Sequence, residues 1–123
     1  IIQDPTLLHQ VDVFAGLRPD GYMLINTAKS LGELGLDEFV KDFRAERLLT
    51  VPASDLAREH TGRPIANAAL LAGFAALSGL ISLESVVLAI GEKLPARLVD
   101  GNVAAARDAY DWVTRELAEP AHA

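Results

Sequence analysis

The sequence predicts an α/β fold built on a mostly parallel sheet, with a helical carboxyl-terminal half. Two short apolar runs, at residues 22–25 and 47–52, have the length of strands that are buried on both faces. Helix-period patterns lie before, between and after these runs, which is the alternation typical of parallel βαβ units. Beyond residue 62 the sequence carries helical patterns and no strand signal.

The amino-terminal half alternates strand and helix patterns. Residues 1–3 resemble the end of a strand. Asp4 followed by Pro5 is typical of a helix start, because a proline at the first helical position loses no hydrogen bond. Gly62 is placed to end the last helix of this half, since glycine accepts a positive φ. Helices are expected from Pro5 to a close at Gly16, and at residues 37–43 and 54–60.

The central stretch is a turn at Gly62 that opens into an apolar helix ending near Leu77. Residues 64–83 hold no charged side chain, so this helix must be covered by protein on most sides. The length of the run raises the alternative of a membrane span. The many alanines and glycines, the breakers Ser78 and Gly79, and the lack of aromatic belts favour two buried helices joined by a short turn.

Two further helices complete the expected fold. Ser82 is a good N-cap with Glu84 in the first turn, and this helix is expected to run to about Lys93, before the next proline. The last helix is expected from Val103, with one apolar face and one charged face. Trp112 lies off the apolar stripe, so it either covers an edge of the domain or touches a partner.

Length and charge restrict the class of protein. Residues 1–123, with a mass of 13.1 kDa, are expected to form a single domain. The net charge of −6 repels a phosphate backbone, which disfavours nucleic-acid binding. Without cysteine the sequence offers no disulfide, thiolate zinc site or cysteine ligand for a cluster, which fits a reducing compartment. With no secretory signal pattern at its start, the chain is expected in the cytoplasm.

We expect no catalytic residue and no metal ligand in this chain. His9, His60 and His122 are scattered, and none has a second histidine three or four residues away, so surface histidines are expected. The sequence has no nucleophile elbow, no cysteine nucleophile and no pair of carboxylates that spacing would place face to face.

Four polar residues form a candidate binding edge. Asn26 and Thr27 follow an expected strand, and parallel sheets bind ligands beyond the carboxyl ends of their strands. Arg63 precedes the central helix and Asn67 lies in its first turn, where free N–H groups and the helix dipole favour a phosphate or a carboxylate. Each residue also has a simpler interpretation: polar turn residues cap the next segment, and Arg63 pairs with an acid such as Glu59.

A series of short motifs runs along the chain: DPTLL at 4–8, GLRPDG at 16–21, INT at 25–27, GRPIAN at 62–67 with Gly73, LISLE at 80–84, and Asn102. In order and spacing this series resembles the gamma subunit or gamma domain of the 2-oxoacid:ferredoxin oxidoreductases. The resemblance covers essentially the whole chain, and the series is far more specific than any single motif.

The resemblance implies a Rossmann-like three-layer α/β/α fold. The family's gamma domain also contains an earlier strand and a Gly-Gly-Gln-Gly turn that are not present here. Residues 1–123 therefore resemble the carboxyl-terminal portion of an oxidoreductase gamma domain, with a sheet that is incomplete at the amino terminus. The missing part of the domain is then one expected partner of this chain.

Complexes of this family decarboxylate a 2-oxoacid on thiamine diphosphate, pass electrons through iron–sulfur clusters to ferredoxin, and form an acyl-coenzyme A. The resemblance implies an accessory layer that packs against thiamine-binding and iron–sulfur subunits, binds neither group alone, and helps to position coenzyme A through Asn26, Thr27, Arg63 and Asn67. The alternative is a non-catalytic α/β module for ligand binding or scaffolding. An isolated Rossmann-type enzyme is disfavoured by the missing glycine fingerprint.

Overall fold

The structure, a computed structural model, describes residues 1–6, 18, 21–35 and 47–118. Of the helix expected from Pro5 to Gly16, only residues 5 and 6 are described, and the helix expected at residues 37–43 lies outside the described residues. The described elements are, in chain order, β1 (Met23–Asn26), β2 (Leu48–Val51), α2 (Ala53–Thr61), α3 (Asn67–Ser78), α4 (Leu83–Lys93) and α5 (Ala96–Ala118).

β1 and β2 pair in parallel, as the alternation of strand and helix patterns predicts. Ile2 adds an isolated parallel bridge to Ile25 on the same sheet. The N–H of Ile2 donates to the carbonyl oxygen of Leu24 at 2.8 Å, and the carbonyl oxygen of Ile2 accepts from the N–H of Asn26 at 2.9 Å. The strand end predicted at residues 1–3 is therefore present as one bridge beside β1.

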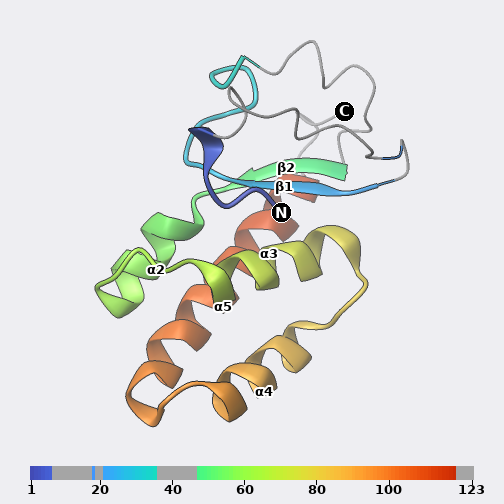
Figure 1. Cartoon of the computed structure of the whole chain (residues 1–123). Coiled ribbons are helices and arrows are strands. Elements are labelled where there is room, and N and C mark those ends of the chain that lie inside the picture. Colours follow the sequence, from blue (N-terminus) through green and yellow to red (C-terminus); the bar gives the residue numbers. More distant parts are fainter. Residues whose placement is uncertain (7–17, 19–20, 36–46, 119–123) are drawn as a thin grey trace.

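The described helices lie on one face of this sheet (Figure 1). α3 and α5 pack directly on the strands, α4 lies beyond them against both helices, and α2 packs against α5. The prediction of a parallel sheet with a helical carboxyl-terminal half is confirmed. The second helical layer of a three-layer Rossmann-like fold is not seen among the described residues.

α3 is the spine of the core. On its sheet side, Leu70 and Ala69 join a cluster with Leu24 and with Val113 of α5. On its other side, α3 presents Ala72 and Ala75, which lie one turn apart. They pack with Val86 and Ile90 of α4 and with Ala106 of α5. The helix is therefore covered on most sides, as its lack of charge predicts. Within the described part of the chain, no helix is long and apolar enough to cross a membrane.

Four helix ends follow the predicted signals. α2 ends at Gly62 with φ of 79°, and α3 ends at Gly79 with φ of 68°, a left-handed conformation that glycine adopts without a steric penalty. α4 begins where Ser82 accepts a hydrogen bond from the N–H of Ser85 at 3.1 Å, and it ends at Lys93. The central helix begins at Asn67, after a segment at residues 64–66 that is neither helix nor strand.

α5 begins at Ala96, so the predicted start at Val103 is wrong. The sequence around Gly101 has the composition of a turn, but glycine has a packing role at this position. A Cβ atom on Gly101 would lie 2.7 Å from the backbone oxygen of His60, so the missing side chain lets α5 pass close to the end of α2. Further along α5, Trp112 is half-buried and packs on the core.

Gly73 offers a direct test of how α3 is buried. A Cβ atom on Gly73 would lie 3.1 Å from Cδ2 of Leu24 and 3.4 Å from Cγ2 of Val113. Gly73→Asp would place a carboxylate between β1 and α5 without a partner, and we expect a loss of about 3–5 kcal/mol in the free energy of unfolding. Urea denaturation followed by circular dichroism measures this loss.

The matched control is Gly91→Asp on α4, where a Cβ atom would meet nothing within 4 Å. We expect this variant to change the free energy of unfolding by less than about 1 kcal/mol. Equal stability of the two variants would contradict the buried position of Gly73.

Candidate functional site

The structure distributes the four predicted edge residues over three neighbouring hollows. Asn26 and Thr27 line a hollow of about 560 Å³ at the carboxyl ends of β1 and β2. Arg63 and Asn67 line a cavity of about 410 Å³ between α3, α4 and the start of α5. A smaller hollow of about 280 Å³ is lined by both Asn26 and Asn67. The four residues therefore lie along one continuous side of the molecule, but they do not form one cavity.

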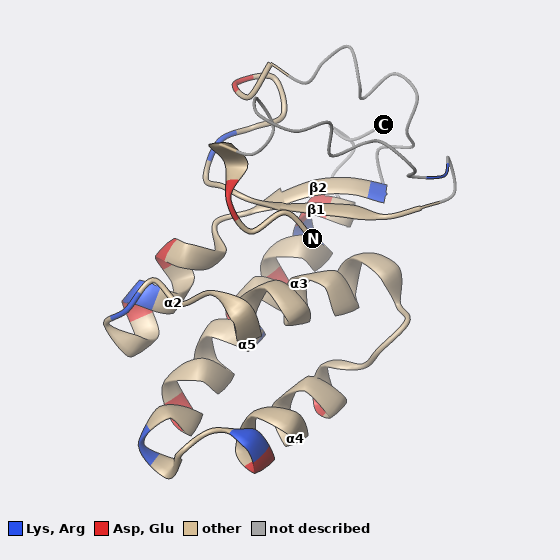
Figure 2. Ribbon diagram, viewed as in Figure 1, with Lys and Arg blue, Asp and Glu red and all other residues tan. Residues whose placement is uncertain are grey.

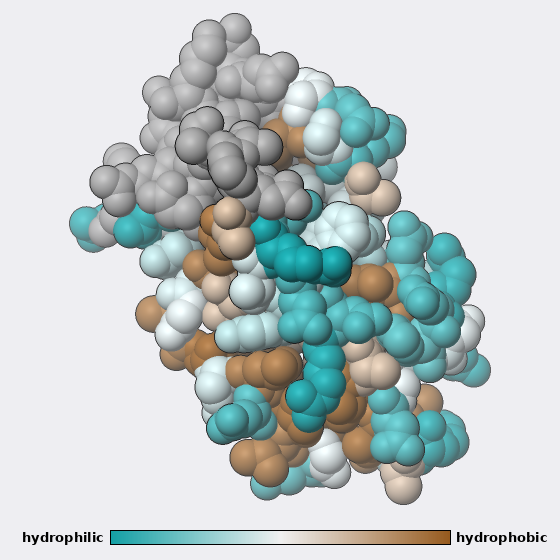
Figure 3. Space-filling view, turned by 180° about the vertical axis from the view of Figure 1, so that it is seen from behind, coloured by the Kyte–Doolittle hydropathy of each residue, from teal (hydrophilic) through white to brown (hydrophobic). Residues whose placement is uncertain are grey.

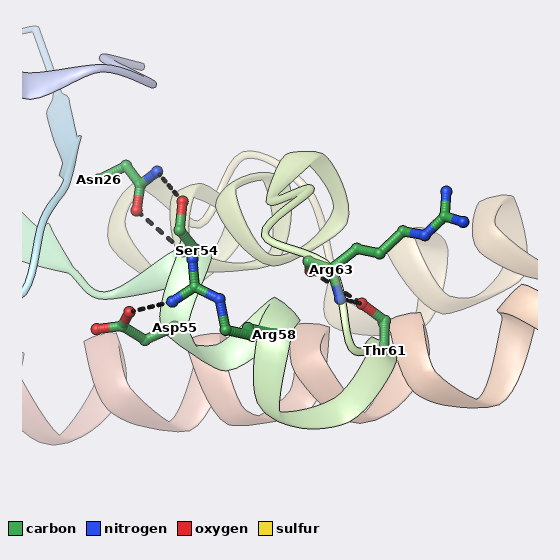
Figure 4. Close-up of polar contacts among 6 residues, drawn as sticks. All are labelled: Asn26, Ser54, Asp55, Arg58, Thr61 and Arg63. Carbon is green, nitrogen blue, oxygen red and sulfur yellow. Dashed lines mark hydrogen bonds and ion pairs between the residues drawn. The ribbon is translucent and has the colours of Figure 1, made fainter.

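Asn26 has a structural role in the described chain. Its side chain is 8% exposed, and its Nδ2 donates to the carbonyl oxygen of Gln3 at 3.0 Å and to Oγ of Ser54 at 2.9 Å. Its Oδ1 accepts from the N–H of Ser54 at 3.1 Å (Figure 4). α2 has no side-chain cap from its own N-cap residue, Pro52. Asn26 therefore stabilises the start of α2 and joins it to the amino-terminal segment that contains Gln3.

Thr27 belongs to a turn at the end of β1. Its N–H donates to the carbonyl oxygen of Val51 at 2.9 Å, and its Oγ1 accepts from the N–H of Lys29 at 3.1 Å. The same hollow is lined by Asp4, whose carboxylate accepts from the hydroxyl and the N–H of Thr6, and these hydrogen bonds lower the pKa of Asp4. The hollow thus contains an ionised carboxylate, which makes it a poor site for an anion.

Arg63 differs from these residues because its guanidinium is exposed and has no hydrogen bond or ion pair with any described residue. Its backbone is held by Thr61, whose Oγ1 accepts from the N–H of Arg63 at 3.2 Å. The side chain extends away from Asn26 and Ser54 (Figure 4). The alternative pairing with Glu59 is not formed.

Asn67 is the first residue of α3 and is exposed. Its Oδ1 accepts one long hydrogen bond, at 3.3 Å, from Nε2 of Gln3. The first intrahelical hydrogen bond runs from the N–H of Leu70 to the carbonyl oxygen of Ala66, and α3 has no side-chain cap. Arg63 and Asn67 both line the cavity between α3, α4 and the start of α5.

Two basic residues that sequence reasoning missed lie at the same cavity as Arg63. Lys93 ends α4 and Arg97 lies in the first turn of α5, and both are exposed. Figure 2 shows basic residues on both sides of the turn between these helices. We call this space the basic-rimmed cavity. Its apolar wall is formed chiefly by Ile65, Leu71, Val86, Ile90, Leu94 and Leu98, and no acidic residue is among its lining residues.

His60 is not the plain surface histidine that the sequence predicts. Its side chain is 26% exposed, and its Nε2 lies 2.5 Å from Oδ2 of Asp108, which ties α2 to α5. His9 and His122 lie outside the described residues. In the part of the chain that the structure describes, no group of three or more histidine, aspartate and glutamate side chains is placed to hold a metal ion.

The chain is a parallel α/β domain, and its surface hollows are suited to bind a ligand or to contact another subunit. Residues 1–112 match the family model described as pyruvate ferredoxin/flavodoxin oxidoreductase. The chain belongs to this family, in agreement with the resemblance carried by its motifs.

The relatives with similar sequences are subunits of oxidoreductases. Pyruvate synthase subunit PorC of Methanothermobacter marburgensis is 37% identical over 113 residues, which cover 90% of this chain and 57% of that protein. The pyruvate/ketoisovalerate oxidoreductases common subunit gamma of Pyrococcus abyssi is 39% identical over 111 residues, covering 90% of this chain and 58% of that protein.

A solved structure has the same fold. The crystal structure of pyruvate oxidoreductase subunit PORC from Thermotoga maritima superposes with a TM-score of 0.70 at 27% identity, covering 89% of this chain and 59% of that one. The chain thus spans little more than half the length of the relatives it matches.

The structural role of Asn26 leads to a stability prediction. Asn26→Ala would leave the N–H of Ser54 and the carbonyl oxygen of Gln3 without their partner, so we expect a loss of about 1–3 kcal/mol in the free energy of unfolding. Asn67→Ala is the control, since it removes one long exposed hydrogen bond and should cost less than about 0.5 kcal/mol. If chemical denaturation gives the same stability for both variants, Asn26 does not hold the start of α2.

Proposed function

We propose that this chain is part of the accessory gamma subunit of a complex that oxidatively decarboxylates a 2-oxoacid to an acyl-coenzyme A and reduces ferredoxin or a similar acceptor. The observation that carries this proposal is the family match over residues 1–112, together with relatives that are named as gamma or PorC subunits. Residues 1–123 correspond to the carboxyl-terminal portion of the gamma domain.

In this proposal the chemistry takes place on other subunits. Thiamine diphosphate and the iron–sulfur clusters are assigned to partner subunits, and for the clusters this agrees with the lack of cysteine in residues 1–123. Ferredoxin is reached through the complex rather than through this chain. The lack of cysteine also fits assembly in a reducing compartment such as the cytoplasm. The choice of 2-oxoacid is assigned to the thiamine-binding subunits.

Within the complex, the edge that includes Arg63 and Asn67 faces coenzyme A or the subunit interface. Two observations support this role: the guanidinium of Arg63 has no partner among the described residues, and both side chains are exposed at the uncapped start of α3. Phosphates bind well to such a combination of arginine and free helix N–H groups. Asn26 and Thr27 shape the edge behind them through the hydrogen bonds described above.

The coenzyme role predicts the kinetics of Arg63→Ala in the assembled complex. We expect the apparent KM for coenzyme A to rise about tenfold, because one charge-assisted contact to a phosphate is lost. The kcat should stay unchanged, since the chemistry takes place on other subunits. Arg58→Ala is the control, because Arg58 pairs with Asp55 at 3.5 Å on α2 and does not line the cavity. An unchanged KM in a fully assembled Arg63→Ala complex would contradict the coenzyme role.

The second candidate function is a non-catalytic module for ligand binding or scaffolding, which the presence of the basic-rimmed cavity favours. Purification from the native organism separates the two proposals. Membership of an oxidoreductase requires co-purification with a brown, thiamine-containing partner, whereas the stand-alone module purifies without one.

A further inference from the structure

We propose that the basic-rimmed cavity binds an amphipathic anion, a small molecule with a hydrocarbon tail and a carboxylate or phosphate head. The proposal goes beyond the function proposed above and does not depend on it. It rests on the shape and lining of a cavity that the family match does not explain.

The interior of the cavity suits a hydrocarbon tail. Its volume of about 410 Å³ falls within the usual range of about 300–1,000 Å³ for small-molecule sites. Two of its large apolar residues are poorly covered in this chain, since Ile65 is 58% exposed and Leu71 is 41% exposed. A bound tail would remove this surface from water, which is favourable in proportion to the area buried. Figure 3 views the molecule from the side opposite to that in Figure 1. Over the half of the molecule formed by α4 and α5, it shows further apolar surface beside polar surface.

The rim of the cavity suits an anionic head. Arg63, Lys93 and Arg97 come from three different segments, and none of them has a hydrogen bond or ion pair with a described residue. The chain as a whole carries a net charge of −6, yet no acidic residue lines this cavity. Like charges gathered at one rim repel each other, and a bound carboxylate or phosphate relieves that repulsion.

The lining also selects against other ligands. None of the lining residues is aromatic, so a nucleotide base would find no stacking partner in the cavity. A tail with a cationic head would meet three positive charges. A neutral tail would leave those charges uncompensated. Carboxylate and phosphate heads satisfy the same residues, so the chemistry fits both a free fatty acid and a lipid phosphate.

Displacement of a fluorescent dansylated undecanoate from the full-length subunit tests the proposal. Dodecanoate and dodecyl phosphate should displace the probe at concentrations at least about tenfold lower than dodecyltrimethylammonium or dodecanol do, because only the first two carry the matching charge. Free coenzyme A should displace the probe much less than dodecanoate does, because its phosphates can reach Arg63 at the rim but it brings no hydrocarbon tail to the apolar interior. Stronger competition by dodecanoate indicates a fatty acid, and stronger competition by dodecyl phosphate indicates a lipid phosphate; both results support the proposal.

Three variants locate the site on the chain. Arg97→Ala should weaken dodecanoate binding about tenfold through loss of one charged contact. Arg107→Ala, an exposed change on the same helix and outside the cavity, should leave binding unchanged. Ala89→Trp should block the cavity from the exposed side of α4 and abolish probe binding while circular dichroism shows a folded subunit.

Three results would overturn the proposal. They are the absence of probe binding, equal competition by the cationic and anionic tails, and equal binding by Arg97→Ala and Arg107→Ala. If the probe does not bind, a segment of protein becomes the remaining candidate to occupy the cavity. The KM for coenzyme A is measured with Arg63→Ala, whereas the amphipath site is tested with Arg97→Ala, which leaves Arg63 in place, so the failure of one proposal is distinguishable from the failure of the other.

Discussion

The close packing of α3 against α5 is the constraint on which the rest of the described structure depends. Small residues meet on both helices: Ala69 lies in one cluster with Ala105 and Ala109, and Ala72 lies in the other with Ala106. Small side chains let two helices approach closely and gain many weak dispersion contacts over a long interface. Because α5 also touches α2, α4 and β2, its contact with α3 fixes the positions of most other elements.

The same packing explains where a cavity forms. α4 packs on α3 and α5 through Val86 and Ile90, while small residues such as Ala68 and Ala89 face the space between the helices. The irregular segment before α3 and the turn between α4 and α5 then bring Arg63, Lys93 and Arg97 to one rim. No single helix contains this combination of an apolar wall and a basic rim. It arises from the way the three helices are held together.

The sequence predicted much of the fold and part of the candidate site. Apolar runs and helix signals located β1, β2, α2, α3 and α4 to within a few residues, because these signals are local. The start of α5 was misplaced because Gly101 serves the close approach of α5 to α2, where an added Cβ atom would lie 2.7 Å from the backbone oxygen of His60, and no local pattern encodes this contact. Arg63 and Asn67 were found from their place at a helix start, whereas Lys93 and Arg97 were missed because only the tertiary fold brings them beside Arg63. The structural role of Asn26 likewise depends on Ser54, a residue distant in the chain.

Native-state amide hydrogen exchange of the full-length subunit tests the central place of the α3–α5 contact most directly. We expect amides at residues 70–77 and 105–113 to exchange only through global unfolding, with the free energy that urea denaturation gives for the whole domain. Amides of α4 should exchange through cheaper local opening, since this helix lies on the outside of the core. Exchange of residues 70–77 at a lower free energy than α4 would contradict the role of α3 as the spine of the core.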